Sequence, residues 1–82
     1  MHEYSIVQAL LDQCELHAAA HHATVVTKVV VQIGRYSGVE SELLMRAFET
    51  FKEGTIAASA ALEIVTSDDR ELLLLSLEAE QP

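Results

Sequence analysis

The sequence predicts an α+β domain: a mixed three-stranded sheet with two helices packed on one face, in the order α-β-α-β-β. Three observations lead to this prediction. Two segments repeat apolar residues at three- and four-residue steps, which is typical of helices with one buried face. Three other segments are β-branched or alternate apolar and polar residues, as strands do. The 82 residues form one domain, residues 1–82, with no room for a second.

The first helix is expected from Tyr4 to about His22, because no Gly or Pro interrupts its apolar period. Its predicted buried face consists of Val7, Leu10, Leu11, Cys14 and Ala18. Cys14, His17 and His21 also share about one quadrant of this helix, a spacing that suits a soft transition-metal site. The favoured interpretation is that Cys14 is a small buried hydrophobe and that His17 lies at the edge of the apolar stripe. His21 and His22, in the last turn, are expected to complement the helix dipole.

The first strand follows at residues 24–33, where valine dominates, and Gly34 ends it. The second helix has a capping-box pair, with Ser37 as N-cap and Glu40 three residues later. Its apolar stripe consists of Leu43, Leu44, Ala47, Phe48 and Phe51. This stripe holds two of the four aromatic residues and is expected to anchor the core. Gly54 is placed to end the helix as its C′ residue.

The last two strands are expected at residues 58–65 and 71–80, separated by the turn-forming residues 66–70. A helical crossover requires the first two strands to be parallel, and the short turn favours an antiparallel hairpin for the last two. One face of the last strand is predicted to carry Leu73, Leu75, Leu77 and Ala79. Four consecutive leucines at its start indicate that both faces are partly covered there.

Thirteen acidic residues against five basic ones give a formal net charge of −8. This charge argues against binding to nucleic acid or to an anionic membrane, and it favours cations and basic protein partners. A single cysteine precludes an internal disulfide and suits a reducing compartment. There is no signal-peptide pattern and no apolar run of about 18 residues, so a cytoplasmic protein is expected. No nucleophile–base pair or phosphate-binding loop is found, so an enzyme is not expected.

The first three residues form a candidate metal-ligand set, provided that the amine of Met1 is the free end of the chain. That amine, the following backbone amide nitrogen and the imidazole of His2 can close fused chelate rings around one ion. The amide or carboxylate of Glu3, or a nearby side chain, can supply the fourth donor. A planar set of nitrogen and oxygen donors favours Ni(II) or Cu(II) over zinc.

Four stretches make the chain similar to a known family. They are Met1-His2-Glu3-Tyr4-Ser5-Ile6-Val7, Val29-Val30-Val31-Gln32-Ile33-Gly34, Ala47-Phe48-Glu49-Thr50-Phe51 and Leu74-Leu75-Ser76-Leu77-Glu78. Together they resemble the HypA/HybF family of hydrogenase nickel-incorporation proteins over nearly the whole chain. The resemblance implies nickel at His2 with Glu3 in support. It also implies Glu40 as an outer ligand or as a partner of a ligand, although a capping role alone would explain Glu40.

One feature departs from this family. HypA/HybF proteins carry a zinc-binding segment with two Cys-x-x-Cys pairs between the second and third strands, and this sequence has neither pair. The pattern indicates that a zinc subdomain has been excised near residues 66–70, and no bound zinc is expected. The short connection favours a monomer or, if the last strand is exchanged, a domain-swapped dimer.

The function expected from the resemblance is that of a nickel metallochaperone, which binds Ni(II) at its N-terminus and delivers it during NiFe-hydrogenase maturation. The implied partners are a HypB-type GTPase and the hydrogenase large subunit, with urease maturation proteins as further partners. The alternative is a protein-interaction module that docks to maturation partners without binding metal itself.

Overall fold

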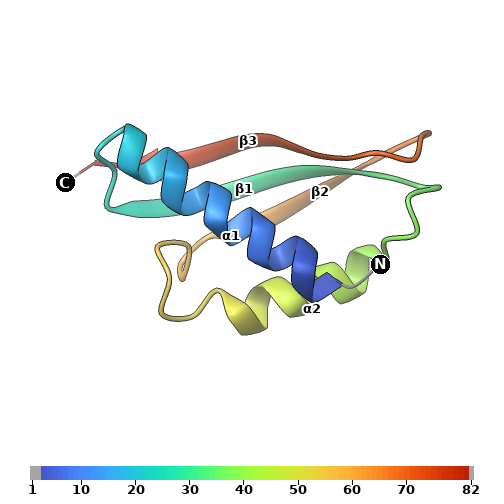
Figure 1. Ribbon diagram of the computed structural model, residues 1–82, viewed down its shortest axis with the longest axis horizontal. Coiled ribbons are helices and arrows are strands. Elements are labelled where there is room, and N and C mark those ends of the chain that lie inside the picture. Colours follow the sequence, from blue (N-terminus) through green and yellow to red (C-terminus); the bar gives the residue numbers. More distant parts are fainter. Residues whose placement is uncertain (1–2, 82) are drawn as a thin grey trace.

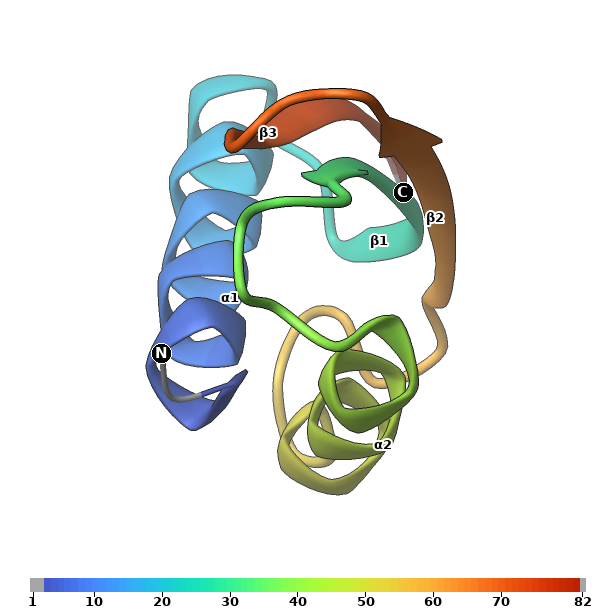
Figure 2. The ribbon, with the colours of Figure 1, turned by 90° about the vertical axis from the view of Figure 1, so that its right-hand side faces the viewer.

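A curved three-stranded sheet carries both helices on its inner side (Figure 1; Figure 2). The structure, a computed structural model, describes residues 3–81. Its elements are α1 (Glu3–Ala20), β1 (Val25–Gly34), α2 (Ser41–Phe51), β2 (Ala61–Ser67) and β3 (Leu72–Glu80). The predicted α+β class and the order α-β-α-β-β are therefore confirmed. No helix among the described residues is both long and apolar enough to cross a membrane.

The strand order is β2-β1-β3, with β1 in the middle. Because β1 runs parallel to β2 and antiparallel to β3, the predicted mixed sheet is confirmed. The predicted hairpin between the last two strands is wrong, since β2 and β3 lie on opposite sides of β1. The connection 68–71 instead crosses the end of β1, at one tip of the molecule (Figure 1).

Close backbone contact with the end of β1 allows this crossing. The amide of Gly34 donates a hydrogen bond to the carbonyl of Glu71 at 2.7 Å. The amide of Tyr36 donates to the carbonyl of Asp69 at 3.0 Å. A Cβ atom on residue 34 would lie 2.6 Å from the carbonyl carbon of Asp69, so only glycine fits beneath the connection. Gly34 therefore ends the strand and also lets four residues carry the chain past it.

A β-bulge decides which leucines of β3 face the helices. Val30 pairs with Ser76 and Val31 pairs with Leu74, which leaves Leu75 without a partner in β1. The extra residue reverses the inward and outward alternation along the strand. The leucines that pack against the core are Leu72, Leu74 and Leu77. The prediction of one common face for Leu73, Leu75, Leu77 and Ala79 is therefore wrong.

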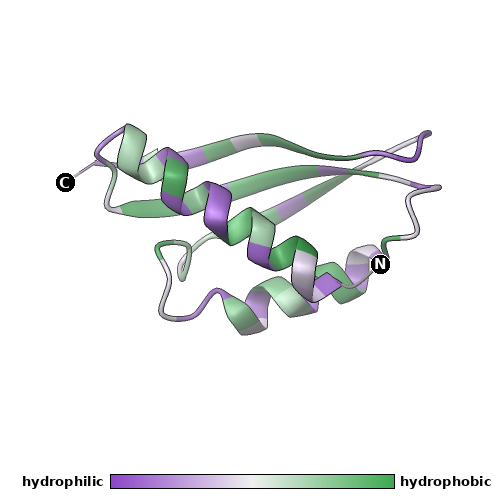
Figure 3. Ribbon diagram, in the orientation of Figure 1, coloured by the Kyte–Doolittle hydropathy of each residue, from purple (hydrophilic) through white to green (hydrophobic). Residues whose placement is uncertain are grey.

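The hydrophobic core lies between the inner face of the sheet and the two helices. The buried face of α1 consists of Ile6, Val7, Leu10, Leu11, Cys14 and Ala18, which confirms the predicted stripe. In α2, Leu44 and Phe48 are fully buried, whereas Leu43 and Phe51 are 43% and 44% exposed, so the stripe is narrower than predicted. Figure 3 shows hydrophobic and hydrophilic residues alternating along both helices, as expected for helices with one buried face.

The first helix ends at Ala20, about two residues before its predicted end, in a Schellman motif. The amide of Ala23 donates to the carbonyl of Ala18 at 2.8 Å, and the amide of His22 donates to that of Ala19 at 3.4 Å. His22 has a φ of 56°, the left-handed conformation that glycine usually supplies in this motif. The absence of glycine is the reason that the sequence pattern concealed this helix end.

The second strand begins at Ala61 rather than at residue 58, because residues 53–59 form turns after α2. Lys52, the C-cap of α2, donates a hydrogen bond from Nζ to the carbonyl of Ala60 at 2.9 Å. Gly54 has a φ of 76° and is the second residue after this C-cap. It therefore occupies the C″ position and not the predicted C′ position.

Candidate metal-binding site

The predicted ligands divide between the start of α1 and the residue before α2. Met1 and His2 lie outside the described residues. Glu3 is the first residue of α1 and is partly buried. Glu40 is exposed and directly precedes α2. The structure thus describes two of the four predicted ligands, one in the first turn of α1 and the other at the N-cap of α2.

The start of α1 is held firmly to the rest of the protein. Ile6, Val7 and Leu10 are only 8%, 0% and 4% exposed. The rings of Tyr4 and Phe51 meet edge to face with their centroids 4.7 Å apart, which ties the start of α1 to the end of α2. The first turn of α1 is therefore a fixed support for any site built at Glu3.

The backbone at the start of α1 is also suited to a metal. The first four amide groups of an α-helix have no acceptor within the helix, so the amide of Glu3 is not used by a helical hydrogen bond. A deprotonated amide nitrogen carries negative charge, which the positive end of the helix dipole stabilises. Backbone nitrogen donors are therefore favoured at this end of the helix.

The predicted capping box of α2 is wrong. Glu40 is itself the N-cap residue, with φ −90° and ψ 120°, and its side chain makes no capping hydrogen bond. Ser37 lies outside the helix, where its Oγ accepts a hydrogen bond from the amide of Val39 at 3.2 Å. Glutamate is not among the residues that cap helices well, unlike the shorter aspartate. The carboxylate of Glu40 is therefore not used for capping.

The predicted cluster of Cys14, His17 and His21 does not form a metal site. Cys14 is 0% exposed, and burial, with a smaller contribution from the charge of Glu15, raises the pKa of its thiol to about 11. A metal binds the thiolate, which this environment disfavours. Within residues 3–81, no three or more His, Cys, Asp or Glu side chains are grouped to hold a metal ion. The interpretation of Cys14 as a small buried hydrophobe is confirmed.

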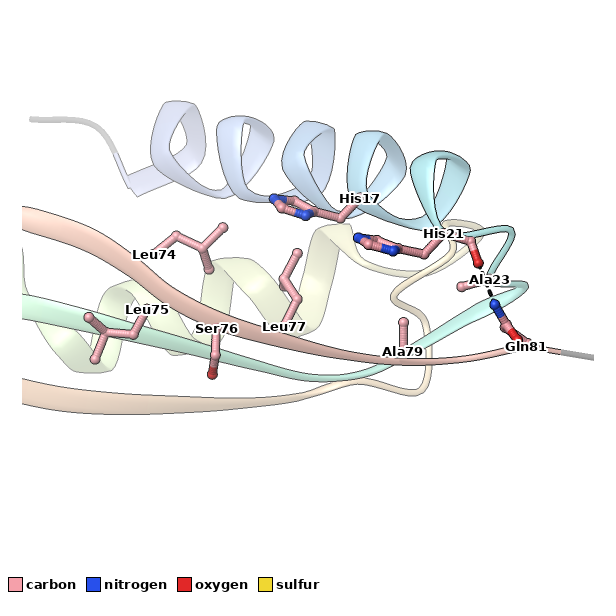
Figure 4. A pocket seen from close by; sticks show the side chains of 9 residues that line it. All are labelled: His17, His21, Ala23, Leu74, Leu75, Ser76, Leu77, Ala79 and Gln81. Carbon is pink, nitrogen blue, oxygen red and sulfur yellow. Dashed lines mark hydrogen bonds between the residues drawn. The ribbon is translucent and has the colours of Figure 1, made fainter.

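A groove between α1 and β3 is the feature that the sequence did not predict (Figure 4). Its volume is about 720 Å³. His17 and His21 border it from α1, and residues 74–77 and Ala79 border it from β3. The spacing of the histidines is visible in the sequence. The floor of the groove depends on the bulge at Leu75, which no periodicity revealed.

Known proteins resemble this chain in sequence and in fold. Residues 1–70 match the family model described as hydrogenase/urease nickel incorporation, metallochaperone, hypA. The hydrogenase maturation factor HypA of Shewanella baltica (strain OS185) is 55% identical over 64 residues, which are 78% of this chain and 55% of that protein. Its counterpart from Aquifex aeolicus (strain VF5) is 60% identical over 62 residues, which are 76% of this chain and 54% of that protein.

A solved structure extends the likeness to three dimensions. The solution structure of the Ni metallochaperone HypA from Helicobacter pylori matches with a TM-score of 0.89 and 31% sequence identity, covering 100% of each chain. By contrast, the chain spans about half the length of the curated relatives that it matches.

Proposed function

The chain belongs to the HypA family of hydrogenase/urease nickel-incorporation metallochaperones, and we propose that it binds Ni(II) at its N-terminus and delivers it during hydrogenase maturation. A metallochaperone is not an enzyme. It carries its metal to another protein, so nickel is its cargo and not a catalytic cofactor. A carrier must hold its metal in a site that a recipient can reach. A site at the end of the chain meets this requirement better than a site within the core.

The observation that supports the proposal is that Met1-His2-Glu3 leads directly into an anchored helix. The Met1 amine, if free, would supply one donor, and the backbone nitrogen and imidazole of His2 would supply two more. The amide or carboxylate of Glu3 would complete a planar set, which Ni(II) accepts readily. The exposed carboxylate of Glu40 would act as an outer ligand or would orient a ligand.

The partners that we propose are proteins of hydrogenase maturation: a HypB-type GTPase and the hydrogenase large subunit, with urease maturation proteins as further recipients. The net charge of −8 favours basic surfaces on these partners. We also propose that these 82 residues hold no structural zinc. The single cysteine is buried with a raised pKa, whereas a structural zinc site generally needs several thiolate or imidazole ligands.

A metal-free docking module is the second candidate function, and exposed apolar side chains on the two outer strands favour it. Val65 in β2 is 38% exposed, and Leu73 and Leu75 in β3 are 42% and 48% exposed. Val65 and Leu73 pair with Gln32 of β1 from its two sides, so they flank it on one face of the sheet, and a contiguous exposed apolar patch is typical of a surface that binds proteins. In this case, changes at His2 would leave partner binding and function untouched.

Two variants that each remove one donor test the nickel site. His2→Ala removes the imidazole, and a Gly-Ser extension ahead of Met1 removes the free amine. Each variant is expected to lose the weak visible absorption band that Ni(II) gives in a planar site, while far-UV circular dichroism stays unchanged. His22→Ala is the matched control, since it removes an exposed histidine at the other end of α1 and should keep the band.

The mass of the intact parent protein must first show that Met1 carries no modification or additional residue. If the parent shows no such band, or if both donor variants keep it at the parental affinity, the proposed site is wrong. A parent that binds partner proteins but no nickel would support the docking module instead.

A further inference from the structure

The groove between α1 and β3 brings two imidazoles to one surface. His17 and His21 are four residues apart on α1, so their side chains lie on one side of the helix, one turn apart. Figure 4 shows both rings over the groove, with Leu74, Leu77 and Ala79 pointing toward them from β3 and Ser76 pointing away. Among the lining residues, all within the described part of the chain, the one side-chain hydrogen bond runs from Gln81 Nε2 to the carbonyl oxygen of His21, at 2.7 Å. Both imidazoles are therefore free to bind a ligand.

Two histidines at this spacing on a helix are a recurrent way to bind a transition metal, because both imidazoles reach one ion from the same face. Imidazole nitrogen suits nickel, copper and zinc. The pair lies near the C-terminal end of α1, where the negative end of the helix dipole favours a bound cation. The side chain of Gln81, just after β3, is hydrogen-bonded to the carbonyl of His21, just after α1, which ties the two segments together beside the pair.

We propose that His17 and His21 form a second Ni(II)-binding site, in which the two imidazoles chelate one ion and water fills its remaining coordination positions. The buried thiol of Cys14 takes no part. With only two protein ligands, the site releases its metal more readily than a site with a full ligand set. It therefore serves as a point of exchange and not as a structural centre.

This second site is separate from the proposed terminal site. His17 lies 14 residues after Glu3 on one helix, a separation of about 21 Å at a rise of about 1.5 Å per residue. One ion cannot contact both positions. The second site therefore stands or falls independently of nickel binding at the N-terminus, and an experiment can test each one alone.

The test uses the protein with a Gly-Ser extension ahead of Met1, so that the terminal set lacks its free amine. Nickel chloride is titrated while proton–nitrogen NMR spectra are recorded. The expected result is a saturable shift or broadening confined to the amides of the groove, residues 17–23 and 74–81, with the amides of residues 3–7 unaffected. His17→Asn and His21→Asn should each abolish the saturation, and the double variant should lose no more than either one, because losing one imidazole already breaks the chelate.

His22→Asn is the matched control, since it removes a neighbouring exposed histidine that is outside the groove. It should leave the titration unchanged. Three results would overturn the proposal: no saturable effect in the extended protein, unchanged saturation in either groove variant, or an equal loss in His22→Asn. Far-UV circular dichroism of each variant checks that the fold is retained, and a failure at this site leaves the absorption test of the terminal site unaffected.

Discussion

The two halves of α1 bury different kinds of side chain. The first half buries large aliphatic residues: Ile6, Val7, Leu10 and Leu11. The second half buries only the small side chains of Cys14 and Ala18. Large buried side chains hold the start of the helix against the rest of the core. Small ones fill less of the space above β3, where the groove lies.

The difference shows two ways in which one helix can present metal ligands. At its start, packing fixes the helix end, and the proposed donors come mostly from the backbone and the end of the chain. At its far end, the proposed donors are side chains at helical spacing beside a groove that packing leaves open. Rigid attachment therefore matters for the terminal site, whereas open space matters for the imidazole pair.

The largest expected effect tests the packing of the first half. Leu10→Ala should lower the free energy of unfolding by about 2–5 kcal/mol, because it removes a large buried side chain and leaves a cavity. Leu16 lies on the same helix but is 63% exposed, so Leu16→Ala should change this free energy by less than about 0.5 kcal/mol. Urea unfolding followed by circular dichroism measures both variants. Similar losses in the two variants would contradict the burial pattern described for α1.

The contrast between local and long-range features also explains what the sequence could predict. The five elements follow from apolar spacing within single segments, so their order and type were predicted correctly. The partner of β3 was not, because a short connection can form a hairpin or cross a neighbouring strand. The choice depends on Gly34, which lies more than thirty residues earlier and makes room for Asp69. No local pattern contains that contact.

The candidate site divides in the same way. The donor chemistry of Met1, His2 and Glu3 could be inferred from residue types alone. The capping role of Ser37 could not be judged, because Ser37 and Glu40 have the right spacing but the helix begins only at Ser41. His17 and His21 were visible as a spaced pair. Their shared groove became visible only once β3 was placed beside α1.

Cys14 lies where the two halves of α1 meet, and the stability of the protein at alkaline pH tests how well its thiol is buried. Burial raises the pKa of its thiol from the ordinary value of 9.0 to about 11 in the folded protein. Between these values the unfolded chain releases the proton and the folded protein keeps it, so stability falls as pH rises. Below pH 9 the thiol is protonated in both states, and it lowers the free energy of unfolding only above this pH. By pH 11 this free energy should fall by about 2–3 kcal/mol, at about 1.4 kcal/mol per pH unit.

Other groups also titrate in this range, so the measured quantity is the difference in unfolding free energy between the parent and Cys14→Ala. This difference should shift in favour of the variant between about pH 8 and about pH 10.5, because alanine has no proton to release. Urea unfolding at the two pH values measures it. A difference that stays constant would mean that the thiol is not shielded from solvent at the middle of α1.

The smallest expected effect concerns the far end of the helix, where few large side chains contribute and the backbone turn carries more weight. His22 holds the left-handed conformation with φ 56°, which costs a residue with a Cβ atom about 1–2 kcal/mol relative to glycine. His22→Gly should therefore raise the free energy of unfolding by about 1 kcal/mol, as measured by urea unfolding. Ala19→Gly, three residues earlier and within the helix, should lower it by about 0.5–1 kcal/mol. The same new residue would thus have opposite effects at two positions three residues apart. A loss of stability in both variants would mean that the end of α1 does not depend on this left-handed turn.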